Sequence, residues 1–273
     1  MTDARAQNLA VDGTPTVIRM SAGPIATSPE ARQLVEDVRR RADAFVFLCG
    51  GASGMARQSK QGLLALLSAL STVGDFGLRI AVGDGGTQAG IMEAAGLARR
   101  ASGRPFPLIG VSPALEILPL GAPGRTPVDP NHTHIVAVDN PEWVARRRKE
   151  GWTPDLGYWG SETDTMYALF ARLAEGKPSV TLVANGGTIA LDEVAQNVRA
   201  SRRMIVVAGS GRAADALVSS LRGTSPTDDE MHELRERVDR EGLTARPELL
   251  HVFDLDAGPG ALTQLLERIL VAR

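Results

Sequence analysis

The sequence predicts an α/β fold of the Rossmann-like, doubly wound type, with a mostly parallel sheet and helices on both faces. Two observations predict it. Short apolar, β-branched runs alternate along the chain with amphipathic stretches of helical period. Several runs, among them FVFL (45–48) and MIVVA (204–208), are apolar throughout, as expected for strands buried on both faces of a parallel sheet.

The candidate strands are eight apolar runs, at 16–20, 44–51, 78–86, 107–113, 134–139, 180–187, 203–211 and 249–255. The main candidate helices have apolar residues at helical spacing, at 28–42, 60–73, 163–176 and 261–272. A further helical pattern follows the Gly-Ser-Gly-Arg stretch at 209–212. The order of the strands in the sheet cannot be read from the sequence.

The 273 residues suit one large domain over 15–273, preceded by a polar and flexible N-terminus over 1–14. Three predicted insertions interrupt the alternation of strands and helices. One near 112–131 is rich in Pro and Gly, and one near 139–160 holds tryptophans and a basic run. The third, near 223–247, contains a charged pattern that predicts an exposed helix. Long irregular insertions often form lids or binding loops, and the plainer alternative is a solvated surface excursion.

Composition narrows the range of functions. A formal net charge of -2 and an aromatic content of 4% disfavour nucleic acid as the main partner. No apolar stretch is long enough to cross a bilayer and no signal pattern is visible, so we expect a cytoplasmic protein without a membrane partner. Cys49 is the only cysteine, which excludes an intrachain disulfide and a multi-cysteine zinc site.

His132 and His134 are the nearest approach to a metal motif. Further ligands are not apparent in the sequence, so we expect one of them to make a single polar contact and the other to lie at the surface. We therefore predict no metal site and no required cofactor.

Four candidate strands end in glycine turns, namely Gly50-Gly51, Gly85-Gly86, Gly186-Gly187 and Gly209-Ser210-Gly211. The carboxyl ends of parallel strands meet at one edge of a sheet, so these turns are expected to converge there. Glycine lets the backbone approach a phosphate closely, and the following helix N-terminus offers unpaired N–H groups. The turns therefore predict a phosphate-bearing ligand. The alternative is that they are only short connections between strand and helix.

Other nucleotide and acyl-transfer motifs are not satisfied. The sequence near Lys60, GMARQSKQG, is not an ATPase P-loop, and no Gly-x-Ser-x-Gly elbow is present. GSGRAA (209–214) does satisfy the dinucleotide pattern Gly-x-Gly-x-x-Ala. It lies late in the chain, however, and the acidic residues after it fall in a polar segment rather than at the end of the next strand. An NAD-dependent dehydrogenase is therefore disfavoured.

Side chains around the turns have two possible roles each. Arg212 pairs with a phosphate through its planar fork, or forms a salt bridge with Asp215. Asp84 accepts a ribose hydroxyl, or caps its own turn. Backbone amides and the Thr87 hydroxyl are the expected phosphate donors. The predicted ligand-binding residues are Gly50, Gly51, Ala52, Ser53, Gly54, Asp84, Gly85, Gly86, Thr87, Gly186, Gly187, Gly209, Ser210, Gly211, Arg212 and Asp215.

Seven short motifs occur in the order found in a known superfamily. They are CGGASGM (49–55), VGDGGTQAGIM (82–92), PLIGVSP (107–113), HTHIVAVD (132–139), WGSE (159–162), VANGG (183–187) and AGSGRAAD (208–215). On these motifs the chain resembles the SLOG superfamily, in the LSDAT-like branch shared by prokaryotic stand-alone proteins and the N-terminal domain of melastatin-type TRP channels. The resemblance implies a Rossmann-like fold that binds nucleotide-derived ligands, such as ADP-ribose or NAD-related molecules.

The same superfamily looks related to cytokinin-activating phosphoribohydrolases, whose motif is Pro-Gly-Gly-x-Gly-Thr-x-x-Glu. Aligned on Gly86-Thr87, the position of the catalytic glutamate holds Gly90, which has no carboxylate. Glu93 lies close to that helical face, but Glu162 in WGSE is the better candidate for a catalytic carboxylate. Its alternative role is to cap the next helix.

Two functions remain open from the sequence. The missing glutamate favours a sensor or signalling module that binds a nucleotide-derived ligand without turnover, acting through self-association as a homo-oligomer or through a partner chain. The alternative is a hydrolase of a nucleotide N-glycosidic bond, with Glu162 as its catalytic residue.

Overall fold

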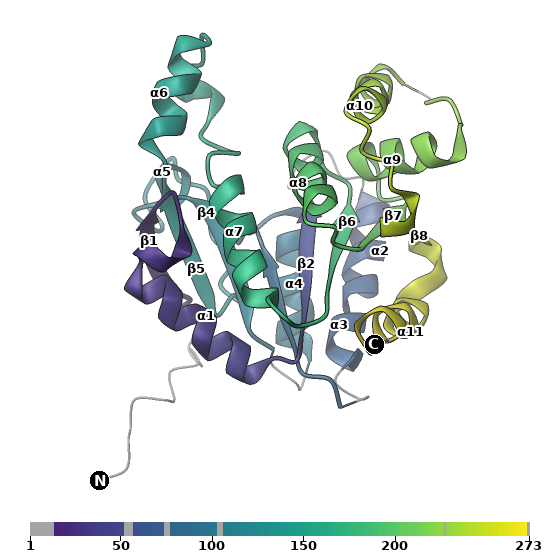
Figure 1. The fold of residues 1–273 in the computed structure, drawn as a ribbon, viewed down its shortest axis with the longest axis horizontal. Helices are drawn as coiled ribbons and strands as arrows, with labels where there is room; N and C mark the ends of the chain where they lie inside the picture. The colour runs from purple at the N-terminus through teal and green to yellow at the C-terminus, as the bar shows by residue number, and fades with distance from the viewer. Residues whose placement is uncertain (1–13, 52–56, 74–76, 103–105, 227, 272–273) are drawn as a thin grey trace.

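A computed structural model describes residues 14–51, 57–73, 77–102, 106–226 and 228–271. Within these residues one sheet has eight strands in the order β1-β5-β4-β3-β2-β6-β7-β8, and every neighbouring pair is parallel (Figure 1). The doubly wound α/β prediction is confirmed, and each predicted strand is present. They are β1 (Thr16–Ser21), β2 (Ala44–Gly50), β3 (Ile80–Asp84), β4 (Leu108–Pro113), β5 (His134–Asp139), β6 (Ser179–Ala184), β7 (Met204–Ala208) and β8 (Leu250–Asp254).

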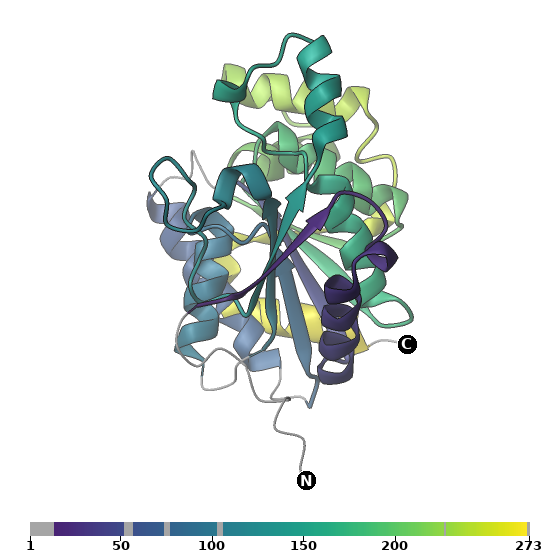
Figure 2. The same cartoon turned by 90° about the vertical axis from the view of Figure 1, so that its left-hand side faces the viewer.

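Helices cover both faces of the sheet, as Figure 2 shows for α1 on one side and α2 with α4 on the other. One face carries α2 (Arg57–Leu67), α3 (Ala69–Thr72), α4 (Gly90–Ala101), α5 (Ala114–Ile117) and α11 (Gly258–Val271). The other carries α1 (Pro29–Arg41), α7 (Thr163–Ala174), α8 (Thr188–Arg199), α9 (Arg212–Arg222) and α10 (Asp229–Arg240). Two helices, α6 (Pro141–Lys149) and α10, project above the carboxyl edge of the sheet in both views.

The central strands are apolar on both faces because they are buried on both. In β2, Val46 and Leu48 pack under α2, α4 and α11, whereas Phe45 and Phe47 pack under α1 and α7. Phe47 also stacks on Phe170 of α7, with ring centroids 4.2 Å apart. The continuous apolar runs in the sequence therefore reflect a core on each side of the sheet.

Polar caps fix where several helices begin. The Ser28 hydroxyl accepts from the Ala31 amide at the start of α1, with Pro29 in the first turn. Asn140 caps α6 and Asp228 caps α10 in the same way. The short 3-10 helices are η1 (Ile25–Thr27), η3 (Pro154–Leu156), η4 (Pro247–Leu249) and η5 (Leu255–Ala257).

Two of the predicted insertions contain more regular structure than expected. The 112–131 segment includes α5, and the 139–160 segment forms α6 and η3. The helix predicted at 60–73 is divided into α2 and α3. The exposed helix expected in the 223–247 segment is α10: most of its residues are exposed, and Leu234 and Val238 are buried against α9 and its neighbours.

The strand order creates a switch point at the centre of the sheet. From β2 the chain extends outward on one side through β3, β4 and β5, and then returns to extend on the other side through β6, β7 and β8. In open α/β sheets ligands bind in the crevice at the carboxyl ends of the strands, where this direction reverses. Here the direction reverses between β2 and β6, so the crevice lies at the carboxyl ends of β2 and its two neighbours, β3 and β6. Among the helices described, none is long and apolar enough to span a membrane.

Candidate functional site

A cavity of about 490 Å³ lies at this reversal, and we call it the switch-point pocket. Seven predicted site residues line it and come from the ends of β2, β3 and β6, the start of α9 and the segment before α7; they are Gly50, Gly51, Gly85, Thr87, Glu162, Gly187 and Arg212. The structure adds lining residues that were not predicted as site residues: Leu48, Ala89, Met92, Thr126, Trp159, Thr188, Ile189, Ala190 and Glu193.

The remaining predicted residues lie elsewhere. The lining does not include Asp84, Gly86, Gly186, Gly209, Ser210, Gly211 or Asp215, nor the alternative carboxylate Glu93. Gly211 and Asp215 line a separate open cavity of about 360 Å³ beside α9, to which Arg212 also contributes. Ala52, Ser53 and Gly54 lie outside the described residues, as does most of the predicted flexible N-terminus.

Some of the glycines are explained by packing between turns. A Cβ at Gly50 would lie 2.2 Å from the carbonyl oxygen of Ala184 on the neighbouring strand. Gly86 has a φ of +75°, and its Cβ would lie 2.9 Å from the Cα of Gly110. Gly85 has more room, because its Cβ would meet only the Met92 side chain, at 3.8 Å. Among Gly50, Gly85 and Gly86, Gly85 is therefore the one beside which the pocket is open.

The N-terminus of α8 opens directly into the switch-point pocket. Its N-cap, Gly187, and the first three helical residues, Thr188, Ile189 and Ala190, all line the cavity. The first N–H groups of an α-helix have no intrahelical acceptor, and Gly187 has no side chain to supply one. Unpaired donors and the positive end of the helix dipole therefore face the cavity.

The guanidinium of Arg212 lies beside the N-terminus of α8. A Cβ at Gly187 would be 3.0 Å from its guanidinium. The alternative prediction of an Arg212–Asp215 salt bridge is wrong, because Arg212 donates from Nε to Glu230 at 2.7 Å. The Asp215 carboxylate instead accepts from the amides of Gly209, at 2.7 Å, and Gly211, at 3.0 Å. Asp215 therefore holds the turn that positions Arg212.

Two carboxyl groups line the same pocket, and burial changes the acidity of both. Glu162 is 6% exposed, and burial raises its pKa to about 7. Its Oε2 accepts from the Gly160 amide at 2.9 Å and makes no cap bond to α7, so the alternative capping role is not observed. Burial also raises the pKa of Glu193 to about 8, and the charge of Glu162 adds to the shift. Near neutral pH this pair therefore retains protons that exposed carboxyl groups would have lost.

A buried ionic chain supports the turn after β3. Asp84 is fully buried, and its Oδ1 accepts from the Gly86 amide at 2.7 Å and lies 2.7 Å from Nε2 of His132. The other ring nitrogen of His132 lies 2.8 Å from Asp129. Burial opposes the charged imidazole, but the two carboxylates outweigh it and raise the pKa of His132 to about 9. Asp84 thus caps its turn, as one alternative predicted.

The expectation of a single polar contact for one of the two histidines does not describe His132, because its ring is a buried link between two acids. Sequence reasoning missed this chain because Asp84 and His132 are 48 residues apart. Among the described residues, the structure has no group of three or more His, Cys, Asp or Glu side chains arranged to hold a metal ion.

Comparisons with known proteins place the chain in a family. A search of the curated proteins found no match to the chain. A family model described as "SLOG in TRPM, prokaryote" matches residues 43–264, a span that runs from the start of β2 into α11 and includes every residue of the switch-point pocket. The chain therefore belongs to this prokaryotic SLOG family.

Proposed function

We propose that the switch-point pocket binds a nucleotide-derived ligand of the ADP-ribose or NAD-related class, with a phosphate at the N-terminus of α8. Membership of the SLOG family supports a nucleotide-related role in binding or processing. The observation that carries the proposal is the convergence on one cavity of three glycine turns, an uncapped helix N-terminus and Arg212.

The raised pKa values of the two carboxyl groups are compatible with an anionic ligand. Ionised carboxylates beside a phosphate would repel it. With pKa values of about 7 and about 8, Glu162 and Glu193 are largely protonated at pH 6.5 and can donate hydrogen bonds to the ligand. Half-buried Trp159 supplies an aromatic surface on the same wall, of the kind on which a base can stack.

Within this class, the function we favour is sensing or signalling without turnover. Gly90, at the position of the catalytic glutamate in related phosphoribohydrolases, begins α4 and is buried. Glu93 is absent from the pocket lining. Neither residue therefore provides the family's carboxylate to a ligand in this pocket.

A second function, hydrolysis of the N-glycosidic bond of the same ligand, is favoured by the pair Glu162 and Glu193. Glycoside hydrolysis uses two carboxyl groups, one of which donates a proton to the leaving group. A pKa near the working pH is the property that such a general acid needs. Glu162 has this property, with its pKa raised to about 7 by burial.

One experiment separates these outcomes. Purified protein is incubated with NAD, ADP-ribose, cyclic ADP-ribose, AMP and ATP, and the melting temperature and the products are measured in parallel. A rise in melting temperature without products supports the sensor. Products that disappear in Glu162→Gln, while the ligand still raises the melting temperature, support the hydrolase. If none of the five compounds raises the melting temperature, the proposal is wrong.

A further inference from the structure

A buried chain of polar side chains runs between α7 and α8 and ends at Glu193, which lines the switch-point pocket. Its other members are Tyr167 on α7, Asn197 on α8, Thr181 on β6 and Arg202 in the segment after α8. Each of these four is at most 8% exposed, and Asn197 and Thr181 are fully buried. Buried polar groups are nearly always hydrogen-bonded, so the direction of each bond in the chain can be traced.

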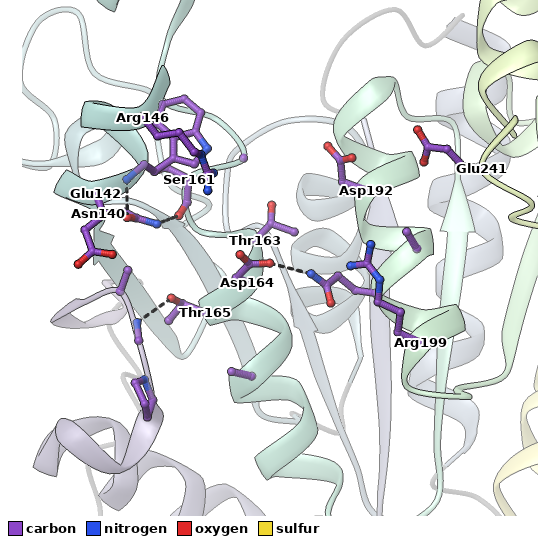
Figure 3. A pocket seen from close by; sticks show the side chains of 18 of the residues that line it. Asn140, Glu142, Arg146, Ser161, Thr163, Asp164, Thr165, Asp192, Arg199 and Glu241 are labelled. Atoms are coloured by element: carbon purple, nitrogen blue, oxygen red, sulfur yellow. Dashed lines mark hydrogen bonds between the residues drawn. The ribbon is translucent and has the colours of Figure 1, made fainter. Parts of the chain in front are cut away.

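The two helices that carry this chain are also joined outside it. A larger cavity, of about 1040 Å³, runs between α6 and α7 on one side and α8 and α10 on the other (Figure 3). There the Asp164 carboxylate on α7 accepts from Nε2 of Gln196 on α8 at 2.7 Å. Tyr167 and Asn197 line neither this cavity nor the switch-point pocket. Because α7 and α8 are joined at two places, the movement of Tyr167 relative to Asn197 is restricted.

The orientation of the Asn197 amide is fixed by its neighbours. Its Oδ1 accepts from the Thr181 hydroxyl at 2.7 Å and from the Arg202 guanidinium at 3.2 Å. Its Nδ2 donates to the Tyr167 hydroxyl at 3.0 Å and to the backbone carbonyl of Glu193 at 2.9 Å. A guanidinium only donates and a carbonyl oxygen only accepts, so the amide cannot be turned round. Asn197 is therefore the donor in its bond to Tyr167.

Tyr167 passes this direction on to Glu193. Its hydroxyl accepts from Asn197, which leaves its single hydrogen for Oε2 of Glu193, at 3.4 Å the longest bond in the chain. Burial raises the pKa of Tyr167 well above its usual value, so the hydroxyl keeps this hydrogen. If Glu193 donated instead, the hydroxyl hydrogen would have no acceptor within the described residues. Oε2 of Glu193 is therefore an acceptor.

Four titratable side chains act on the carboxyl group of Glu193. They are Cys49 on β2, Glu162 before α7, Tyr167 on α7 and Asp192 on α8. Burial, assisted by the charges of the two acids, raises the pKa of Glu193 to about 8, although hydrogen bonds with the thiol and the hydroxyl oppose the rise. At pH 7 the carboxyl group therefore carries a proton. Neither hydrogen-bonding partner within the described residues is a strong acceptor for it, because the hydroxyl donates and a thiol sulfur accepts only weakly.

We propose that Glu193 is a specificity-determining residue of the switch-point pocket, which donates a hydrogen bond from Oε1 to an acceptor atom of the ligand. Tyr167 and Asn197 are positioning residues: they hold Oε2 as an acceptor and leave Oε1 as the oxygen that carries the hydrogen. In the nucleotide-derived ligand of the proposed function, on which this assignment rests, the acceptor is a phosphate oxygen, a carbonyl oxygen or a ring nitrogen.

Calorimetric titration of the full chain with ADP-ribose and with NAD tests the donor role of Glu193. In Glu193→Gln the amide oxygen accepts from Tyr167 and the NH2 group still donates toward the ligand, whereas Glu193→Met does neither. At pH 6.5 Glu193→Gln should therefore bind about tenfold or more tightly than Glu193→Met. Between pH 6.5 and pH 9 the affinity should fall less in Glu193→Gln than in wild type, because an amide does not ionise. Glu233→Met, an exposed change on α10, is the control and should bind like wild type.

The positioning role of Tyr167 is tested without a ligand. Carboxyl carbon NMR of the full chain labelled in glutamate gives the pKa of Glu193, whose resonance is identified by its loss in Glu193→Gln. Tyr167→Phe removes the donor to Oε2, so the pKa should rise by about one pH unit from its wild-type value of about 8. Merely loosened packing would admit water and lower the pKa instead. Tyr158→Phe, outside the chain, should leave it unchanged.

The outcomes separate this inference from the proposed function. The inference is overturned if Glu193→Met binds as tightly as Glu193→Gln, or if the pKa of Glu193 in Tyr167→Phe equals or falls below that of wild type. If wild type binds neither compound, the proposed function fails and the selection by Glu193 fails with it, while the NMR result still decides whether Tyr167 fixes Oε2. Adenosine locates the acceptor: a loss in Glu193→Met for adenosine as well as ADP-ribose places it on the nucleoside, and a loss for ADP-ribose alone places it on the phosphates or the second ribose.

Discussion

At the residue scale, burial of Glu162 makes a prediction about stability and pH. Burial raises its pKa from 4.5 to about 7, so the folded state holds a proton that the unfolded chain releases above pH 4.5. The stability contributed by this group therefore declines as pH rises from about 4.5 to about 7, and is constant above that. Glu162→Gln, whose amide oxygen still accepts from Gly160, should remove this decline and stabilise the protein at pH 8 by up to about 3 kcal/mol.

Urea unfolding at pH 4 and at pH 8 measures this effect, with Glu233→Gln as the matched control. Glu233 is exposed on α10. The Glu233→Gln variant should therefore differ from wild type in its free energy of unfolding by the same small amount at both pH values. A Glu162→Gln variant that is less stable than wild type at pH 8 would contradict the prediction, because Glu162 would then be stabilising as a charged group.

Glu193 shows why site residues are harder to find than strands. Its sequence neighbourhood is an ordinary amphipathic helix with no motif, and it faces the pocket only because α8 follows β6 at the switch point. Gly85, Thr87 and Arg212 were identifiable, since each belongs to a turn directly after a strand. Glu162 was found from the WGSE motif, but its raised pKa depends on burial that no local pattern encodes.

At the element scale, the turn before α9 depends on one carboxylate. Asp215 accepts from the amides of Gly209 and Gly211 and thereby fixes the position of Arg212. Asp215→Ala should lower the free energy of unfolding by about 1–2 kcal/mol. Thermal melts measure it against Asp229→Ala, an exposed acid in the first turn of α10, for which we expect a loss of only a few tenths of a kcal/mol. Equal losses in the two variants would show that Asp215 contributes only through the helix dipole.

Helix α4 packs so closely on the 129–132 segment that one glycine is required. A Cβ at Gly96 would lie 1.9 Å from Oδ2 of Asp129, which is held by His132 and Asn131. Helix propensity alone favours Gly96→Ala by about 1 kcal/mol, but the clash should reverse the sign and destabilise the protein by about 2 kcal/mol or more.

The matched change for Gly96→Ala is Gly260→Ala in α11. A Cβ at Gly260 meets nothing within 4 Å, so this variant should be neutral or up to about 1 kcal/mol more stable. Chemical denaturation of both variants gives the comparison. If Gly96→Ala is stabilised as well, the Asp129 side chain is not fixed where the structure places it.

The helices were less visible in the sequence than the strands, for a physical reason. Central strands are buried on both faces and appear as unbroken apolar runs. Helix α6 has no buried residue, so it carries no apolar stripe and was predicted as an irregular insertion. Its N-cap Asn140 and the following Pro141 were the signals that could have identified it.

At the scale of the whole molecule, the fold class followed from local patterns, but the strand order did not. The position of the switch point depends on which strands pair across more than a hundred residues, as β2 does with β6. That pairing brings Gly50 and Gly187 to one cavity and leaves the Gly209–Gly211 turn outside its lining. The sequence therefore predicted that the glycine turns converge on one edge of the sheet, and the structure identifies the particular turns that line the switch-point pocket.

The central claim is that a nucleotide-derived ligand occupies the switch-point pocket, and the melting temperature with and without ADP-ribose or NAD tests it most directly. At least one of the two should raise the melting temperature at pH 6.5. The rise should shrink at pH 9, where Glu162 and Glu193 are ionised and repel the phosphates. Gly85→Leu, which fills the pocket beside Met92, should abolish the rise, whereas Gly260→Leu should not. A rise that persists in Gly85→Leu, or no rise with either compound, would contradict the account.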